Sequence, residues 1–486
     1  MNKKVGIIGT GVAGLSAAVR MAVRGHEVHA FEANAYPGGK LSEIEVGEYR
    51  FDAGPSLFTM PQYLEDLFAL AGKKFSDYCP YDRLDPITHY FFQDGTQFNS
   101  DADPVLFAQD IERKFGIKEE VILDHLQKSR EIFDLSAEAF LHNPIQLTSF
   151  DLLKIGTRLG ALDIFNTMHE TNKKRMKHPK MVQYFDRFAT YNGSNPYEAP
   201  GTLNIIPHLE HHVGAFFPKG GMYSITKAIH RFAEELGVHF HFNTRIVEIV
   251  TEKNKVKGLK SSDGALWALD MVVSNMDVMY TYKRLMPSQK SPDKVLNQPR
   301  ALSAMVFYLG IKKVFPQLGL HNIFFSDDYK KEFDVFFKAR SIADDLTIYI
   351  NISSKFKEDD APKGCENWFV MVNTPPNTGQ DWDVLVSRTR KNVIEKLSRV
   401  LGEDIESLID AEDVLEPRII EQKTSSYQGS LYGSSSNNKF AAFLRHANDS
   451  STIQGLYFCG GSVHPGGGIP LSVLSAKIVD ELIHKK

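Results

Sequence analysis

Residues 4–32 read KVGIIGTGVAGLSAAVRMAVRGHEVHAFE, and this stretch predicts a complete nucleotide-binding unit. The apolar run 4–8 is typical of a buried strand, and residues 13–24 have helical composition. Between them, residues 9–14 form a G-x-G-x-x-G turn. A second strand is expected over residues 28–31. Strand, glycine turn, helix and strand in this order are typical of the first half of a dinucleotide-binding fold.

The residues of this turn have separate expected roles. Gly9 permits the tight turn, Gly11 lets the backbone approach a pyrophosphate, and Gly14 lets the helix pack closely on the strand. Together with Ala13 they place the pyrophosphate at the N-terminus of the helix. Glu32 lies 18 residues after Gly14, close to where an acidic side chain binds a ribose hydroxyl. We therefore predict that the chain binds a dinucleotide.

The next segments indicate which dinucleotide. Pro37-Gly38-Gly39-Lys40 is followed by Phe51-Asp52-Ala53-Gly54-Pro55-Ser56. A glycine pair before a cation fits a backbone that passes close to a diphosphate, with Gly39 at the phosphates and Lys40 paired to one of them. Nicotinamide dehydrogenases usually run straight on to a third strand here, so the glycine pair favours FAD. No second G-x-G-x-x-G lies between a strand and a helix, so no NADPH site is visible.

Composition and charge bound the remaining possibilities. At 486 residues the chain suggests two or three domains, and a net charge of -4 gives no reason to expect nucleic acid. Its three cysteines are too far apart for a C-x-x-C pair or a thiolate zinc site, which suits a reducing compartment. No signal peptide and no run of 18 apolar residues is recognisable. We expect a cytoplasmic protein that could lie peripherally on the cytoplasmic membrane.

Flavin-type elements occur in three separated pieces of the chain. After the N-terminal unit, Phe217-Pro218-Lys219-Gly220-Gly221-Met222 opens a helix, and a strand is expected over 269–274. A last strand and glycine turn over 455–461 precede His464-Pro465-Gly466-Gly467-Gly468-Ile469-Pro470 at the start of the final helix. The fold class predicted from this layout is α/β, with two domains. They are a discontinuous Rossmann-type FAD-binding domain of residues 1–74, 216–299 and 416–486, and an inserted α+β substrate-binding domain of residues 75–215 and 300–415.

The inserted stretches differ from one another in character. Residues 150–200 have a helical and aromatic composition. In contrast, residues 304–310, 346–350 and 368–372 have the composition of strands. Helices packed over a floor of strands would enclose a large apolar pocket, which is the expectation for the second domain.

At this point the chain resembles the bacterial-type carotenoid desaturases, flavoenzymes that include phytoene desaturase. The resemblance extends over essentially the whole length. Its most specific element is the run from His464 to Pro470, which is similar to the closing signature of that family. The stretches 38–43 and 55–59 are most similar to the branch that introduces a 3,4 double bond into hydroxylated or monocyclic carotenoids. The other motifs that carry the resemblance are the N-terminal fingerprint with Gly38-Gly39, Phe51-Asp52-Ala53-Gly54-Pro55, Ala189-Thr190-Tyr191-Asn192-Gly193-Ser194-Asn195-Pro196-Tyr197 and Phe217-Pro218-Lys219-Gly220-Gly221-Met222.

The resemblance implies FAD as cofactor and a carotenoid as substrate. It places Val247 beside the adenine, and it places four residues near the ribityl chain and the flavin ring. Those four are Pro55, Gly461, Ile469 and Pro470. Lys40 departs from the family pattern, because many members carry arginine there, and a bidentate phosphate contact becomes a point charge.

Desaturation removes a hydride from one carbon and a proton from its neighbour, and FAD can take the hydride. The sequence names no catalytic base; Glu198 and His464 are candidates by motif membership alone. His208, His211 and His212 form a polar cluster that lacks the H-E-x-x-H order of a zinc hydrolase, so no metal is expected. The electron acceptor is expected to be oxygen or a quinone.

A C40 hydrocarbon does not dissolve in water, so contact with a membrane surface is expected. An apolar stripe at helical spacing is followed at once by a basic cluster, the pattern of an interfacial anchor. A core-facing helix followed by a solvated basic loop explains the same pattern equally well. The stripe is Leu152, Ile155, Leu159, Leu162, Phe165 and Met168, and the cluster is Lys173, Lys174, Arg175, Lys177 and Lys180.

Three alternatives to 3,4-desaturation stay open at this stage. One is a desaturase of the phytoene or neurosporene type. Another is a flavin amine oxidase of related fold, which would be expected to carry an aromatic cage for the amine. The last is a carotenoid isomerase or carrier that performs no net oxidation.

Overall fold

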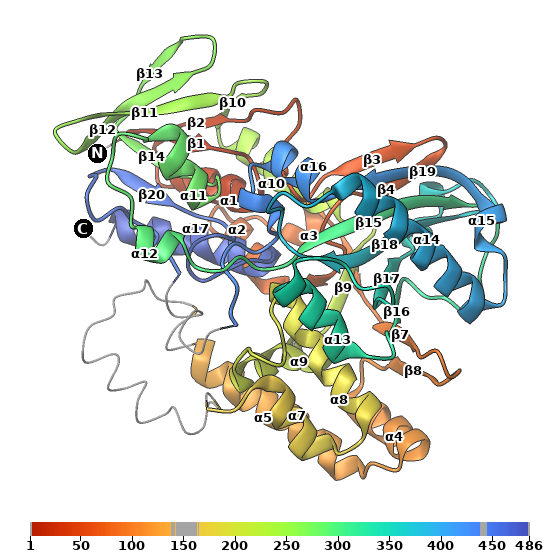
Figure 1. Cartoon of the computed structure of the whole chain (residues 1–486). Helices are drawn as coiled ribbons and strands as arrows, with labels where there is room; N and C mark the ends of the chain where they lie inside the picture. Colours follow the sequence, from red (N-terminus) through yellow and green to blue (C-terminus); the bar gives the residue numbers. More distant parts are fainter. Residues whose placement is uncertain (1, 138–140, 142–162, 164, 438–444, 485–486) are drawn as a thin grey trace.

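A five-stranded parallel sheet carries the nucleotide-binding unit in this computed structural model, which describes residues 2–137, 141, 163, 165–437 and 445–484 (Figure 1). The strand order is β10-β2-β1-β14-β20. The strands are β1 (Lys4–Ile8), β2 (Glu27–Phe31), β10 (His239–His241), β14 (Met271–Ser274) and β20 (Leu456–Phe458). The chain leaves β1 toward β2 on one side, and β14 pairs with β1 on the other, so the topological switch point lies between β1 and β14. Ligands of open α/β sheets bind at this point, beyond the carboxyl ends of the strands.

The two faces of this sheet bury different layers. Side chains alternate along a strand, so Val5 and Ile7 enter one core cluster and Ile8 enters another. The first cluster contains the helices α1 (Val12–Val23), α10 (Tyr223–Glu235) and α17 (Ile469–His484). The second contains the antiparallel sheet of β11 (Ile246–Glu252), β12 (Lys255–Ser261) and β13 (Leu266–Ala268). Gly6 leaves room on that face for Leu269, whose Cδ1 would lie 2.5 Å from a Cβ at this position.

A seven-stranded mixed sheet forms the floor of the second half of the molecule. Its order is β19-β15-β18-β17-β16-β7-β8, and β16 and β7 are its one parallel pair. The strands are β7 (Thr88–Phe91), β8 (Gln97–Ser100), β15 (Ser303–Ile311), β16 (His321–Phe324), β17 (Ile348–Asn351), β18 (Glu366–Thr374) and β19 (Ile409–Leu415). All nine residues of β15 are buried, as expected for a strand covered on both faces.

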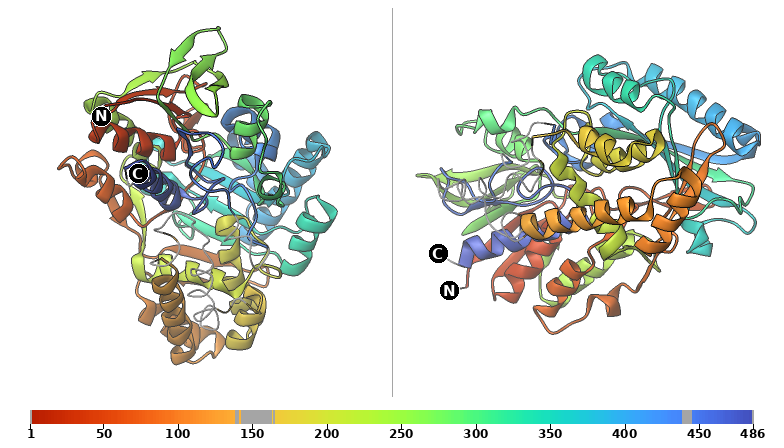
Figure 2. Two further views of the ribbon diagram at one scale, coloured as in Figure 1. Left: turned by 90° about the vertical axis from the view of Figure 1, so that its left-hand side faces the viewer. Right: turned by 90° about the horizontal axis from the view of Figure 1, so that it is seen from below.

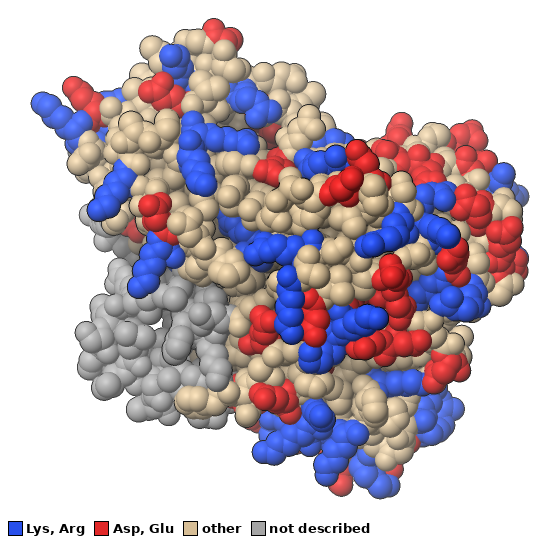
Figure 3. Space-filling model, viewed as in Figure 1, with Lys and Arg blue, Asp and Glu red and all other residues tan. Residues whose placement is uncertain are grey.

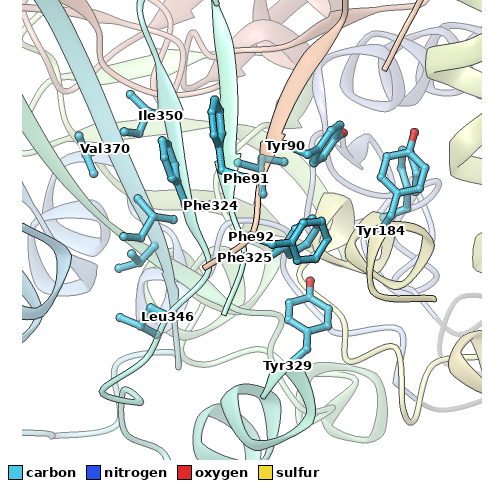
Figure 4. Close-up of a cluster of buried hydrophobic side chains, with 14 of the residues drawn as sticks. Tyr90, Phe91, Phe92, Tyr184, Phe324, Phe325, Tyr329, Leu346, Ile350 and Val370 are labelled. Atoms are coloured by element: carbon cyan, nitrogen blue, oxygen red, sulfur yellow. The ribbon is translucent and has the colours of Figure 1, made fainter. Parts of the chain in front are cut away.

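Aromatic side chains fill the space between this sheet and the helices next to it (Figure 4). Phe91 of β7 stacks on Phe324 of β16 with ring centroids 4.6 Å apart. Tyr184 meets Tyr90 edge-on at 5.1 Å, a geometry that aromatic pairs prefer. The helices at this end are α4 (Pro104–Phe115), α5 (Glu119–Ser136), α7 (Met168–Met176) and α8 (Pro179–Asp186).

Short strands connect the two large sheets. The hairpin of β3 (Glu43–Val46) and β4 (Tyr49–Asp52) contacts β19 and β18 of the mixed sheet. A three-stranded sheet of β5 (Phe58–Thr59), β9 (Ala215–Pro218) and β6 (Tyr81–Arg83) follows, and β5 also contacts α17. In both turned views of Figure 2, α17 lies beside the N-terminal part of the chain, in the half that holds the parallel sheet. The chain from β4 to β5 therefore runs along the boundary between the two halves.

The remaining helices are short, apart from α14 (Trp382–Leu401), which covers the mixed sheet. This helix is amphipathic and buries Trp382, Val393 and Leu397 against that sheet. The others are α2 (Gln62–Ala69), α3 (Phe75–Tyr78), α9 (Ile206–His208), α11 (Val278–Tyr280), α12 (Asp293–Leu296), α13 (Tyr329–Asp334), α15 (Ile405–Leu408) and α16 (Pro417–Thr424).

Every strand and helix of the N-terminal unit is confirmed, with α1 shifted by one residue to Val12–Val23. The strands predicted over 304–310, 346–350 and 368–372 correspond to β15, β17 and β18. The α/β class and the Rossmann-type sheet are confirmed as well. The predicted domain boundaries stay a prediction.

The predicted amphipathic stripe lies mostly outside the described residues. Where the structure describes this stretch, the prediction that one long helix continues through Met168 is wrong. Thr167 caps a new helix, α7, which begins at Met168. Met168 is fully buried, whereas Phe165 is 70% exposed. Among the described residues, no helix is long and apolar enough to cross a membrane.

The basic cluster is also only partly solvated. Lys173, Lys174 and Lys177 are exposed around the end of α7, whereas Lys180 is half-buried and paired with Asp94. Arg175 is half-buried with Nη1 3.3 Å from His125 Nδ1. Lys173, Lys174 and Arg175 lie on α7, Lys177 is its C-cap and Lys180 lies on α8, so none of them is in a long loop. Figure 3 shows lysine and arginine side chains gathered at this end of the molecule.

Candidate cofactor and substrate site

The glycine turn has the geometry of a phosphate cradle. Gly9 has a positive φ of 86°, and a Cβ on Gly14 would lie 2.0 Å from Gly9 O, so both positions require glycine. Gly11 is the N-cap of α1, and no side chain caps the helix there. The first N–H groups of a helix have no intrahelical partners, so those around Val12 and Ala13 are suited to an anion.

Asn275 supports this turn from the sheet side. It follows β14 directly, and its backbone N donates to Ile8 O at 2.9 Å. With its side-chain oxygen toward the turn, Asn275 accepts from Gly11 N at 3.2 Å and from Gly14 N at 3.3 Å. A Cβ on Gly460 would lie 2.6 Å from the same amide. Asn275 therefore joins the N-terminal turn to the loop after β20.

Glu32 is buried at the carboxyl end of β2 and holds two neighbouring segments. Its Oε2 accepts from Thr10 N and Thr10 Oγ1, both at 2.9 Å. Its Oε1 accepts from Asn34 N and Asn34 Nδ2, also at 2.9 Å. A carboxylate has about four lone-pair positions, so a ribose hydroxyl must replace one of these donors. The half-buried Asn34 amide is the donor best able to move.

Gly38 and Gly39 bring the chain beside the first turn of α1. Gly38 N donates to Thr10 O at 2.8 Å, and Gly38 pairs with Gly11 in a parallel bridge. A Cβ on Gly39 would lie 3.6 Å from the Gly11 Cα. The glycine pair therefore lies beside the phosphate cradle. Its contact with a phosphate stays a prediction.

The ammonium of Lys40 points to a different loop. Lys40 Nζ donates to Leu431 O at 2.8 Å and to Ser430 O at 3.3 Å. Burial lowers the pKa of Lys40 to about 8. The sequence predicts that Lys40 contacts a phosphate. For that contact, the ammonium must either leave these two carbonyls or donate to a carbonyl and to the phosphate at the same time.

The Phe51-to-Pro55 motif positions both a helix and a loop. Asp52 accepts from Met222 N at 2.8 Å and Tyr223 N at 2.9 Å, so it caps the start of α10 from a distant segment. Burial raises the pKa of Asp52, opposed by the charge of Arg50 beside it. Pro55 follows at the boundary of the two halves and is half-buried.

The C-terminal loop is fixed by a buried arginine. Arg445 Nη1 donates to Gly461 O at 3.2 Å and to Tyr432 O at 3.0 Å. A Cβ on Gly461 would lie 3.2 Å from the Gly467 Cα, so the two ends of this loop approach closely. The final helix then begins with buried Ile469 and half-buried Pro470.

Val247 lies at the start of β11 and is 39% exposed. Three residues earlier, Thr244 N donates to Glu32 O at 2.8 Å, so the segment before β11 is tied to the residue expected to bind the ribose. This arrangement is compatible with adenine beside Val247. That contact, like the other contacts with FAD predicted for individual residues, stays a prediction.

The residues present fit FAD. Three features meet at the switch point of the parallel sheet. They are an uncapped helix N-terminus, a turn in which two positions require glycine, and a buried carboxylate. FAD would supply hydride acceptance to this site. Within the described ranges, no group of three or more His, Cys, Asp or Glu side chains could hold a metal ion.

We infer that four titratable side chains border one space inside the molecule. Lys40, Tyr191, Tyr349 and Tyr432 are enclosed by protein, and this burial raises the pKa of Tyr432 to about 12. Each of the four nevertheless keeps accessible surface. A side chain that is enclosed yet accessible must face an internal space. Tyr432 touches the C-terminal loop, because a Cβ on Gly467 would lie 2.6 Å from its ring.

A buried ion pair fixes one of these four side chains, Tyr191. Arg187 Nη2 lies 2.9 Å from Glu210 Oε2, and both side chains are almost completely buried. Tyr191 Oη donates to the other oxygen of Glu210. The Arg187 guanidinium also lies 4.1 Å from the centroid of the Phe188 ring. Tyr191 therefore has a fixed hydroxyl, held from behind by a charge pair.

The two candidate bases lie in different surroundings. Glu198 is exposed, and its charge acts on Lys338. His464 is fully buried, its backbone N donates to His446 O at 3.0 Å, and its carbonyl accepts from Asn448 Nδ2 at 2.8 Å. Glu198 therefore lies at the surface, and the backbone of His464 helps to fix the C-terminal loop.

The histidine cluster packs among aromatic rings. The rings of His208 and His212 lie 4.9 Å apart, and His211 Nε2 is 2.8 Å from Tyr184 Oη. Burial lowers the pKa of His211 to about 3, so its imidazole is neutral.

Comparison with known proteins gives a consistent result. The family model described as flavin containing amine oxidoreductase matches residues 12–480. A 1-hydroxycarotenoid 3,4-desaturase from a Flavobacterium species is 48% identical over 99% of both chains. A 4,4'-diapolycopene oxygenase from a Methylomonas species is 32% identical over 99% of this chain and 98% of its own.

Solved structures show the same fold. A variant of putrescine oxidase superposes with a TM-score of 0.66 over 100% of both chains at 13% identity. An oxidoreductase from Methanosarcina mazei superposes with a TM-score of 0.64, covering 98% of this chain and 100% of its own, at 15% identity. At such low identity these likenesses concern the fold alone.

Several residues of this site were missed by sequence reasoning. Asn275 had an available signal, since it directly follows a predicted parallel strand, where ligand-site residues are common. Tyr349 lies on a predicted strand, but no local pattern distinguishes it from a core residue. Tyr432 and Arg445 lie in stretches without recognisable periodicity. Their roles depend on loops that meet only in the folded chain.

Proposed function

Because this chain belongs to the carotenoid desaturase branch of the flavin-containing amine oxidoreductases, and is therefore an FAD-dependent oxidoreductase, we propose that it introduces double bonds into a carotenoid. The most specific form of the proposal is 3,4-desaturation of a hydroxylated linear or monocyclic carotenoid. The observation that carries it is 48% identity over 99% of both chains to a 1-hydroxycarotenoid 3,4-desaturase. Identity to the 4,4'-diapolycopene oxygenase is 32%.

The proposed reaction takes a hydride and a proton from neighbouring carbons, and FAD, when bound, supplies the hydride acceptor. The role of the protein is to bind the hydrocarbon in an enclosed space without water, beside the loops that are expected to hold FAD. Lys40, Tyr349 and Tyr432 border such a space and belong to or contact those loops. Excluding water there protects the electron-poor carbon that hydride removal leaves.

The titratable groups around this space favour orientation over proton transfer. Burial raises the pKa of Tyr191 and of Tyr349 far above the usual range, so both keep their protons. Neutral hydroxyls can position a substrate by hydrogen bonds. We name no catalytic base within the proposal, since Glu198 is exposed and His464 is enclosed by backbone contacts.

The electrons are proposed to leave on oxygen or a quinone. No second dinucleotide fingerprint occurs in the sequence, which argues against NADPH as the partner of the flavin. An apolar substrate and a quinone both reside in membranes, so a peripheral position on the membrane surface is part of the same proposal. Exposed Phe165 and the exposed lysines around the end of α7 support it.

An anaerobic reduction experiment tests the function. The FAD-loaded protein is mixed with a hydroxylated carotenoid in liposomes, and flavin absorbance and extracted pigment are followed. Bleaching of the flavin, together with a pigment that has lost two hydrogens, is expected, and oxygen or a quinone should restore the flavin.

The pigment mass separates the alternatives. Gain of oxygen would indicate oxygenase chemistry, whereas an unchanged mass with an oxidised flavin would indicate a carrier or isomerase. Bleaching by a diamine without carotenoid would indicate an amine oxidase. Rapid bleaching by NADPH alone would contradict the proposed route of the electrons.

A further inference from the structure

Three hydrogen-bonded side chains extend from the loop that contains Pro55 into the mixed sheet. Ser56 follows Pro55, and its Oγ lies 2.7 Å from Tyr349 Oη. Tyr349 Oη in turn lies 2.7 Å from His321 Nδ1. Tyr349 and His321 belong to the neighbouring strands β17 and β16. Because Tyr349 borders the internal space, this chain of hydroxyls and imidazole is accessible from that space.

The direction of each hydrogen bond follows from Asn351. Its side-chain nitrogen lies 3.2 Å from Leu320 O, an acceptor, and 3.2 Å from His321 Nδ1. An amide nitrogen only donates, so His321 Nδ1 shares its one lone pair between Asn351 and Tyr349, and the ring proton is on Nε2, which has no hydrogen-bond partner among the described residues. Tyr349 therefore donates its single proton to Nδ1.

The proton of Tyr349 is thus already used, so Ser56 must donate to the Tyr349 oxygen. The chain then runs in one direction, from Ser56 through Tyr349 to His321. Its outer end is the oxygen of Ser56, which still has two lone pairs. This end of the chain can accept a hydrogen bond from a ligand but has no proton left to donate.

The chain is unsuited to removing a proton from carbon. Burial, together with the charge of Arg187, lowers the pKa of His321 to about 3, so the imidazole is a weak base. Burial also raises the pKa of Tyr349. The remaining role for an enclosed acceptor beside an apolar space is to bind a donor group of the ligand.

We infer that Ser56, Tyr349 and His321 bind the hydroxyl group of the carotenoid, an inference that rests on the proposed function. In a carotenoid with a hydroxyl on carbon 1, a 3,4 double bond forms only two carbons away. Its hydroxyl must then lie close to the flavin when carbons 3 and 4 react. Ser56 meets this requirement through its neighbour Pro55, which the family resemblance predicts to lie near the ribityl chain and the flavin ring.

The inference predicts a change in substrate preference. Tyr349→Phe keeps the ring and removes the hydroxyl that polarises Ser56. The wild-type protein should prefer a 1-hydroxylated acyclic carotenoid over the same carotenoid without the hydroxyl. The variant should lower this preference in kcat/KM by about tenfold, mainly through KM for the hydroxylated substrate. For the unhydroxylated carotenoid, kcat/KM should fall by a much smaller factor, because that substrate has no hydroxyl to lose a hydrogen bond.

Tyr90→Phe is the matched control. Tyr90 lies on β7 of the same sheet and is fully buried, and its hydroxyl has no hydrogen-bond partner among the described residues. This control makes the same chemical change without removing a hydrogen bond. Both variants should keep the FAD content of the parent.

A binding measurement separates this inference from the proposed function. Affinities for the two carotenoids are obtained from quenching of tryptophan fluorescence. If Tyr349→Phe keeps the wild-type preference in binding and turnover, or loses both carotenoids equally, the inference is wrong. If the protein desaturates the carotenoid but Tyr349→Phe does not change the preference for the hydroxylated substrate, only the inference fails and the proposed function stands. Preferential binding of the hydroxylated carotenoid without any product refutes the proposed function and leaves the hydroxyl site intact.

Discussion

At the residue scale, the carboxylate of Glu32 has two tasks. It orders Thr10 and Asn34, and it is expected to bind the adenosine ribose. Replacing Glu32 with alanine should weaken FAD binding by about 1–3 kcal/mol, since a charge-assisted contact is lost. Quenching of flavin fluorescence at limiting FAD measures the affinity.

Glu27→Ala serves as the control for that variant, because Glu27 lies on the same strand and pairs only with Lys4 and His29 at the surface. Its FAD affinity should equal that of the parent. Full flavin occupancy of Glu32→Ala at limiting FAD would count against the ribose contact.

Lys40 should make FAD affinity depend on pH. Burial lowers its pKa to about 8 in the free protein, so the ammonium loses its proton as the pH rises through that value. A diphosphate favours the charged form. If Lys40 pairs with a phosphate, affinity is therefore constant well below this pKa and falls above it.

Lys40→Gln should remove that dependence, because glutamine carries no charge at any pH. FAD dissociation constants are compared over about one and a half pH units on either side of the pKa. Parallel pH profiles for parent and variant would show that Lys40 only holds the carbonyls of Ser430 and Leu431.

Sequence foresaw the residues whose roles are local. The glycines and Glu32 lie within one short segment, where spacing alone constrains them. Tyr349 and Asn275 depend on strands that pair across hundreds of residues, so no local pattern could assign them. Lys40 shows an intermediate case: its motif was recognised, but its partners in the structure are carbonyls of a loop near residue 430.

At the scale of elements, Asp52 links β4 to the start of α10. Its carboxylate caps the helix and lies 2.7 Å from Arg50 Nη2. Asp52→Ala should uncap α10 and leave Arg50 less well neutralised, and loss of one partner of a buried pair costs about 3–5 kcal/mol. Denaturation by urea, followed by circular dichroism, measures the loss.

Glu43→Gln is the comparison for Asp52→Ala, because Glu43 is the more exposed partner of Arg50. This variant should lose less than about 1 kcal/mol, as surface ion pairs do. Equal destabilisation by the two substitutions would contradict a special role of the helix cap.

Elements were foreseen best where one periodicity dominates a segment. β15 and β18 are continuous apolar runs, and they formed as expected. Periodicity misled at Met168, because a pattern of threes and fours continues past Thr167, whose capping box starts a new helix. A cap of this kind outweighs apolar spacing, since it satisfies backbone N–H groups directly.

At the scale of the whole molecule, the internal space borders loops from distant parts of the chain. Lys40, Ser56 and Tyr432 lie at the edge of the FAD unit, whereas Tyr191 and Tyr349 belong to the other half. The sequence predicted helices over a strand floor but not this meeting of loops. Such long-range contacts depend on how the two sheets are placed, which no local composition encodes.

The whole molecule should also have one end that faces the membrane. Lys173, Lys174 and Lys177 are exposed around the end of α7, and exposed Phe165 lies just before its start. Each cation near an anionic surface contributes about 1 kcal/mol. Replacing the three lysines with glutamine should therefore weaken binding to anionic liposomes and slow turnover of liposome-held carotenoid. FAD content and melting temperature should stay unchanged.

Lys253, Lys255 and Lys257 provide a charge-matched control, because they lie around the β11–β12 hairpin at the opposite end of the molecule (Figure 1). Their replacement with glutamine changes the net charge equally but should leave liposome binding intact. Co-sedimentation at low and high salt compares the two variants, since salt screens an electrostatic contribution. If both triple variants bind liposomes like the parent at low salt, the end that carries α7 does not dock on the membrane, because its lysines would then contribute nothing where electrostatic attraction is strongest.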